Sequence, residues 1–225
     1  MRTLRPLVGY IAALSIITGV VISTPDAGVA LASNGPDLVL NLHFTSTDGL
    51  PAESRRALMA EAESIWKLGH IRLKWLREST EADDGDTLRV LVMARPVATS
   101  AHSPWTVGEL LRSEGFRPIA IASTIGARRI IDESQWDQLL APATLHDYRL
   151  GVVLGRAVAH EIGHYMLGTN THATRGLMRA RIASREFADL RSGSFRLDQA
   201  AEAYLAELAA RGTSLDRVTF SYPSP

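Results

Sequence analysis

Residues 159–178 read AHEIGHYMLGTNTHATRGLM, and they begin inside an apolar segment that predicts a helix from about Asp147 to Leu167. His160 and His164 are four residues apart in that segment. Because an α-helix turns once in about 3.6 residues, both side chains lie on one face of the helix, one turn apart. Gly168 follows the last apolar residue and predicts the end of the helix, since glycine readily adopts the left-handed backbone conformation.

The two histidines and Glu161 form the pattern His-Glu-x-x-His, which is typical of zinc-binding helices. Two imidazoles on one face can reach the same ion, while Glu161 points in a neighbouring direction and can contact a water molecule on that ion. Zinc held by three protein groups keeps an open position for water and lowers the pKa of that water toward neutrality. A carboxylate beside the water can accept its proton and pass it to a leaving amine. The pattern therefore predicts a zinc hydrolase with His160 and His164 as metal ligands and Glu161 as the catalytic base.

The residues after Gly168 extend this pattern. His172 could meet the ion from a different direction once the chain has turned back, and residues 175–178 predict a tight turn with Met178 packed beneath the site. Together, residues 159–178 resemble the metzincin clan of zinc peptidases, whose pattern is HExxHxxGxxH followed by a Met-turn. The resemblance implies His172 as the third zinc ligand, a protein or peptide substrate, and hydrolysis of the peptide bond by a zinc-activated water.

The spacing departs from the clan in one respect. Metzincins place a glycine three residues and a histidine six residues beyond the second histidine, and these positions are Leu167 and Asn170 here. Gly168 and His172 come one and two residues late, so the connecting loop must be longer.

Alternatives remain open for both the third ligand and the activity. In a gluzincin-type arrangement a glutamate on a later helix completes the site, and Glu186 and Glu202 are available. A secreted zinc-binding protein without peptidase activity is a second possibility, although a structural site has no need of Glu161. A hydrolase of non-peptide amides is a third, because its zinc chemistry would be the same.

Helix propensity does not explain the whole of the long helix. It contains Gly151, Gly155 and Gly163, and glycine is a poor helix former. We therefore expect other backbone to approach this helix closely.

The remaining sequence predicts an α+β domain around the helix. Predicted strands are Asp37–Phe44, Ile71–Leu76, Thr87–Ala94, Pro118–Ser123 and Arg128–Ile131, and the other predicted helices are Pro51–Leu68 and Leu197–Ala209. Between them we expect a surface loop over residues 95–116 with a short helical piece around Val107–Leu111, and a helical turn or two over Glu133–Leu140. The metzincin resemblance implies a mixed twisted sheet with a backing helix, and a C-terminal helix below the cleft. Pro118–Ser123 is the candidate edge strand for an extended substrate.

The N-terminal segment has the order of a secretory signal. Arg2 and Arg5 precede an apolar run from Leu7 to Ile22, and Ala30-Leu31-Ala32 offers small residues for cleavage. We expect residues 1–32 to be the signal and residues 33–225 the catalytic domain, in a protein that is secreted or resides in the periplasm or cell envelope. Retention of the segment would instead anchor the chain to a membrane.

Composition excludes several other classes. There is no cysteine, which rules out disulfides, thiolate zinc ligands and a cysteine nucleophile. Lys and Arg number 24 and Asp and Glu number 24, so the net charge is zero and the sequence does not predict a nucleic-acid surface. No Gly-x-Ser-x-Gly motif of a serine hydrolase occurs.

Overall fold

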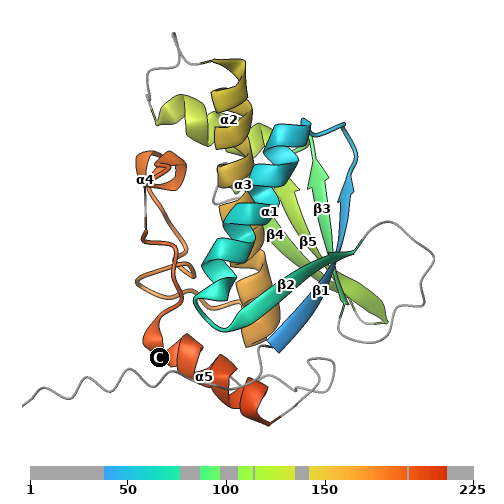
Figure 1. The fold of residues 1–225 in the computed structure, drawn as a ribbon, viewed down its shortest axis with the longest axis vertical. Coiled ribbons are helices and arrows are strands. Elements are labelled where there is room, and N and C mark those ends of the chain that lie inside the picture. Colours follow the sequence, from blue (N-terminus) through green and yellow to red (C-terminus); the bar gives the residue numbers. More distant parts are fainter. Residues whose placement is uncertain are drawn as a thin grey trace, which may run out of the picture. The chain divides into compact units, whose positions relative to one another are not determined.

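A mixed sheet of five strands organises the part of the chain that the computed structural model describes, which is residues 38–76, 87–96, 106–113, 115–134, 142–191 and 193–211. The strands are β1 (Leu38–Ser46), β2 (Ile71–Leu76), β3 (Thr87–Met93), β4 (Gly108–Ser113) and β5 (Phe116–Ser123). Their order is β2-β1-β3-β5-β4, and β4 alone of these strands runs antiparallel to its neighbour (Figure 1). The sheet is therefore mostly parallel, and the architecture is mixed α/β rather than α+β.

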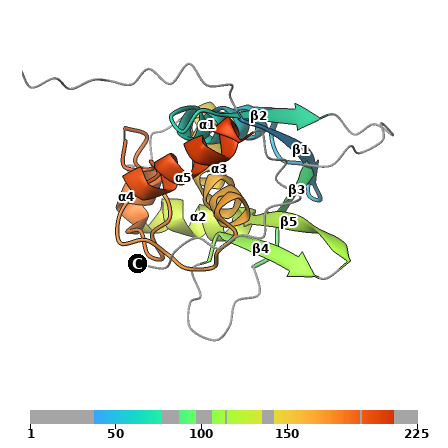
Figure 2. The ribbon, with the colours of Figure 1, turned by 90° about the horizontal axis from the view of Figure 1, so that it is seen from below.

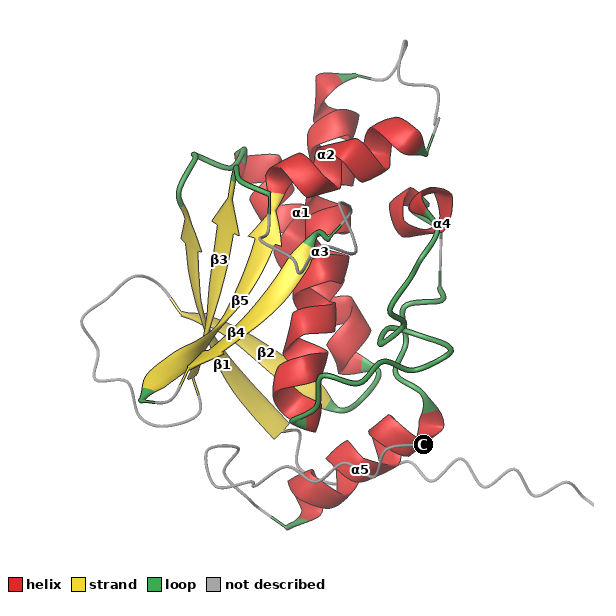
Figure 3. Ribbon diagram, turned by 180° about the vertical axis from the view of Figure 1, so that it is seen from behind, coloured by secondary structure: helices red, strands yellow, loops and turns green. Residues whose placement is uncertain are grey.

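Two long helices cover one face of this sheet (Figures 1 and 2). The helices are α1 (Ala52–Lys67), α2 (Thr124–Glu133), α3 (Ala143–Leu167), α4 (Ser184–Ala188) and α5 (Gln199–Ala210). The pair on the sheet is α1 and α3, and the residues that alternate toward it, such as Leu40 and Leu42 of β1, are fully buried. Between α3 and α5 the described chain consists of loops and the short helix α4 (Figure 3).

The glycines of α3 allow α1 to lie against it. A Cβ atom at Gly155 would be 2.6 Å from the carbonyl oxygen of Leu58, and one at Gly151 would overlap Ser54 in the same way. The indole of Trp66, near the end of α1, donates a hydrogen bond of 3.2 Å to the carbonyl of Ala159. Close backbone packing was the expectation for these glycines, and it is confirmed.

The structure corrects the expected secondary structure between residues 107 and 131. Val107–Leu111, expected to contain a helical piece, leads into strand β4, which pairs with β5. Arg128–Ile131, expected to be a strand, lies inside α2, whose first turn is capped by the Ser123 side chain accepting from the Gly126 N–H at 3.0 Å. Pro118–Ser123 lies within β5, between β3 and β4, so it is not an edge strand; the edge strands of the described sheet are β2 and β4.

Other expectations differ only at their ends or lie outside the described residues. The helix α3 begins four residues earlier than expected, at Ala143, directly after Pro142. The expected signal segment lies outside the described residues, and so does most of Glu133–Leu140. No helix in the described ranges is both long enough and apolar enough to cross a membrane.

Candidate metal centre

Three histidines from two segments meet at the C-terminal part of α3. His160 and His164 are one turn apart on the helix, and their ring centroids are 4.7 Å apart. Gly168 ends the helix with a φ of 61°, and the chain then returns to place the His172 ring 5.3 Å from that of His160 and 4.8 Å from that of His164. One ring nitrogen from each histidine lies within 4.8 Å of the others. The three side chains that the sequence singled out as ligands are therefore brought together.

Hydrogen bonds on the outer side of two rings fix their orientation. His160 Nδ1 lies 2.8 Å from the carbonyl oxygen of Leu177, and His164 Nδ1 lies 2.8 Å from that of Thr169. A carbonyl oxygen only accepts, so each Nδ1 carries the proton and donates it. The lone pair of each ring is then on Nε2, which is the state of a histidine that binds a metal.

The donor set fits a zinc ion. It consists of three imidazoles, without a carboxylate or thiolate among the described residues of the group, and imidazole nitrogens suit zinc. Zinc–nitrogen bonds of about 2.0–2.1 Å in a tetrahedral site put two ligand nitrogens roughly 3.3 Å apart. The spacing here exceeds that by at most about 1.5 Å, which small movements of the rings can close. The group could therefore hold one zinc ion and leave a fourth position for water.

Burial keeps these histidines neutral. It lowers the pKa of His160 and of His164 to about 4, from an ordinary value of 6.5, and each is lowered further by the neighbouring histidines. Burial also lowers the pKa of His172, the most exposed of the three. Neutral imidazoles at physiological pH can donate their lone pairs without first losing a proton.

Met178 supports the helix from below. Its side chain is 4% exposed and packs against Gly163, where a Cβ atom would lie under 3.0 Å from the methionine sulfur. The turn before it contains Gly176 with a φ of 76°, and the Leu177 N–H donates to the Arg196 carbonyl at 2.6 Å. The predicted tight turn with a methionine beneath the site is present, and its Leu177 carbonyl is the group that orients His160.

Glu161 projects from α3 toward strand β4. It is 5% exposed, and its carboxylate accepts a hydrogen bond from the backbone N–H of Leu110 in β4. A Cβ atom at Gly108 would be 2.7 Å from Glu161 Oε1, so a larger residue there would force the carboxylate to move. Burial, with a smaller contribution from Glu109, raises the pKa of Glu161 to about 8. A cation on the three histidines would act in the opposite direction, because positive charge favours the carboxylate.

Strand β4 supplies the site residues that the sequence did not reveal. Besides Gly108 and Leu110, the guanidinium of Arg112 donates to the backbone carbonyl of His164. The sequence predicts a loop here with a short helical piece around Val107–Leu111, and nothing in the local pattern indicates a strand beside α3. The missed signal is non-local, since it is the pairing of β4 with β5 that places them.

The alternative ligands lie elsewhere. Glu186 forms a two-pronged ion pair with Arg179, at 2.5 and 3.1 Å, and accepts a hydrogen bond from Ser194 at 2.6 Å. Neither Glu186 nor Glu202 belongs to the group that could hold a metal.

Comparisons with known proteins give likenesses to solved structures alone. No protein family matches the sequence, and no curated protein matches it. The crystal structure of archaemetzincin from Methanopyrus kandleri matches with a TM-score of 0.46 and 15% sequence identity, over 79% of this chain and 98% of that chain. A likeness of this degree carries no argument about function.

Proposed function

We propose that this chain is an exported, zinc-dependent metallopeptidase of the metzincin type. The observation that carries the proposal is the convergence of His160, His164 and His172, with Glu161 one residue from the first ligand. A purely structural zinc site is usually closed by four protein ligands. Three histidines and an adjacent carboxylate match the catalytic arrangement instead.

The residues of the site divide the chemistry between them. A bound zinc ion would act as a Lewis acid that lowers the pKa of a water molecule and polarises the substrate carbonyl. Glu161 would accept the proton of the attacking water at its carboxylate and deliver it to the leaving amine. The Leu110 N–H holds that carboxylate in place, and the Leu177 and Thr169 carbonyls hold the histidine rings. These contacts supply orientation before the substrate arrives.

Strand β4 is the element along which we place the substrate. It is one of the two edge strands of the described sheet, it pairs with β5 on one side, and, unlike the other edge strand β2, it lies against Glu161. An extended peptide can add to such an edge through backbone hydrogen bonds. Its scissile bond would then lie near the three histidines.

Export is proposed from the sequence alone. The basic start, apolar run and small residues of segment 1–32 have the order of a secretory signal. We therefore place residues 33–225 outside the cytoplasm, in the envelope, the periplasm or the medium.

Cleavage of an unstructured protein tests the activity. The zinc-loaded chain from Ser33 onward should cut casein, with the fragments identified by mass spectrometry. Glu161→Gln should lower the rate by about 10²–10⁴-fold, because proton transfer is lost. The matched control is Glu63→Gln, an exposed position on α1, which should cleave at the unchanged rate. Equal rates for Glu161→Gln and the unchanged chain would contradict the proposal.

A further inference from the structure

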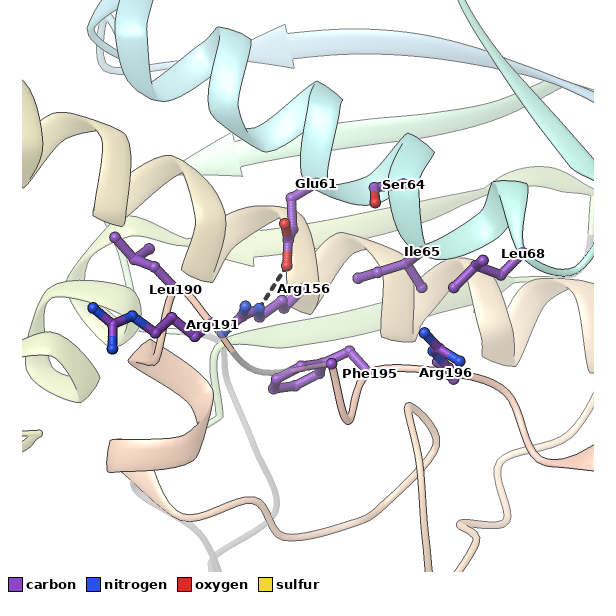
Figure 4. A pocket seen from close by; sticks show the side chains of 10 residues that line it. Glu61, Ser64, Ile65, Leu68, Arg156, Leu190, Arg191, Phe195 and Arg196 are labelled. Carbon is purple, nitrogen blue, oxygen red and sulfur yellow. Dashed lines mark hydrogen bonds and ion pairs between the residues drawn. The ribbon is translucent and has the colours of Figure 1, made fainter.

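A cavity of about 260 Å³ lies on the side of α1 and α3 that faces the loop before α5 (Figure 4). Its walls come from α1 and the residue that follows it, from Arg156 of α3, and from the segments 190–191 and 193–196. None of the proposed metal ligands lines it.

Arg156 is buried at this cavity with part of its guanidinium unused. The side chain is 1% exposed, its Nε donates to Glu61 Oε1 at 2.7 Å, and its Nη1 donates to the carbonyls of Phe187 and Asp189 at 2.8 and 2.9 Å. The Phe195 ring lies 4.3 Å from the guanidinium carbon. Nη2 has no hydrogen-bond partner among the described residues. Nη2 is not among the fully enclosed unsatisfied donors of the described residues, so it can donate to a group in the cavity.

The other walls add positive charge and apolar surface. Arg191 and Arg196 line the cavity from opposite sides of Phe195 (Figure 4), and both side chains are exposed. Glu61 is the one acidic residue among the described residues of the lining, which also includes three arginines, and Glu61 pairs with Arg156. Apolar walls come from residues such as Ile65 and Phe195. The lining thus carries an excess of two positive charges beside apolar surface.

We propose that this cavity binds a small organic phosphate, in which a phosphate monoester is joined to a short apolar group. A phosphate dianion matches the two excess charges, and guanidinium groups pair with phosphate oxygens through parallel N–H donors. Arg156 Nη2 supplies the buried donor, and Arg191 and Arg196 close on the anion from the rim. Phe195 and Ile65 pack against the apolar part.

The cavity is connected to the metal centre by backbone. The Arg196 carbonyl accepts from the Leu177 N–H at 2.6 Å, and the Leu177 carbonyl accepts from His160 Nδ1. A phosphate held by Arg196 therefore sits two hydrogen bonds from a proposed zinc ligand. The binding proposal itself does not rest on the peptidase assignment.

Titration calorimetry with phenyl phosphate on the zinc-loaded full chain tests the proposal. We expect saturable binding that weakens about tenfold in Arg191→Gln and in Arg196→Gln, since each loses a charge-assisted contact worth about a factor of ten. Phenol, which has the ring without the phosphate, should not bind. Arg156 is left unchanged because its three hydrogen bonds also support the fold.

Arg72→Gln is the matched control. Arg72 is an exposed residue of β2 that does not line the cavity, and its replacement removes the same charge. The affinity for phenyl phosphate should therefore stay within about twofold. Phenyl phosphate could also bind at the zinc ion, and that binding would survive in all three variants. Equal affinity in Arg191→Gln, Arg196→Gln and the unchanged chain, or no saturable binding up to about 10 mM, would overturn the proposal.

Discussion

Gly163 offers a direct test of the packing between the metal-binding helix and the methionine turn. In an isolated helix, Gly→Ala is stabilising by about 1 kcal/mol. At this position the new Cβ atom would lie 3.0 Å from Met178 Cε and closer still to the sulfur, in a region where the methionine is 4% exposed. Overpacking of this kind costs about 1–3 kcal/mol. Gly163→Ala should therefore lower the free energy of unfolding by roughly 0–2 kcal/mol, after the helix propensity is subtracted.

The sign should reverse when Met178 is removed. Met178→Ala alone should cost about 2–5 kcal/mol, because a buried side chain is truncated. In that background the new Cβ atom of Gly163→Ala enters vacated space, so the second substitution should raise the free energy of unfolding by about 1 kcal/mol. The two sites are thus coupled by roughly 1–3 kcal/mol.

Urea denaturation of the four proteins in this cycle gives the measurement. The free zinc concentration must be the same in all four, because a ligand that binds the folded state adds to its apparent stability. A stabilising Gly163→Ala in the unchanged background, or additive effects in the double variant, would refute the packing of Met178 against the helix.

Three further predictions concern the strand, the helix end and the pH dependence. Gly108→Ala places a Cβ atom 2.7 Å from Glu161 Oε1 and should lower the rate of casein cleavage while zinc stays bound; an unchanged rate would show that β4 does not hold the carboxylate. Gly168→Ala forces alanine to a φ of 61° and should lower the unfolding free energy in urea by about 1 kcal/mol. The folded-state pKa of His160 and His164, about 4, lies below their ordinary 6.5, so the unfolded chain binds more protons between these pH values. Thermal melts of the chelator-treated chain should show stability falling from pH 6.5 to pH 4, and the decline should be shallower in a His164→Gln variant.

Local signals in the sequence account for the parts of the fold that were predicted well. The His-Glu-x-x-His helix ends at Gly168 as expected, and β2 has the predicted bounds Ile71–Leu76, because alternation of apolar and polar residues is a short-range pattern. The presence of Gly151 and Gly155 in the helix predicts that another segment packs closely against it, but not which segment. That neighbour is α1, which only the tertiary structure identifies.

The parts that were missed depend on contacts between distant residues. β4 reads GELLRS, which has neither β-branched residues nor strict alternation, and its strand conformation comes from pairing with β5. Arg128–Ile131 was expected to be a strand because it ends in a short apolar run, but it lies inside helix α2. The buried positions of that helix, Ala127, Ile130 and Ile131, follow helical spacing. The carbonyls that orient His160 and His164 belong to loops, and no residue pattern predicts where a loop carbonyl points.

The metal content of the purified chain tests the central claim most directly. Elemental analysis of the protein from Ser33 onward, after exposure to zinc and removal of free metal, should give about one zinc per chain. Zinc affinity should fall by about 10-fold or more in His172→Ala, which loses a ligand, and should be kept in Glu161→Gln, whose side chain lies outside the ligand set. A chain that holds no zinc after refolding with the metal present, or a His172→Ala variant that binds zinc as tightly as the unchanged chain, would contradict the three-histidine site.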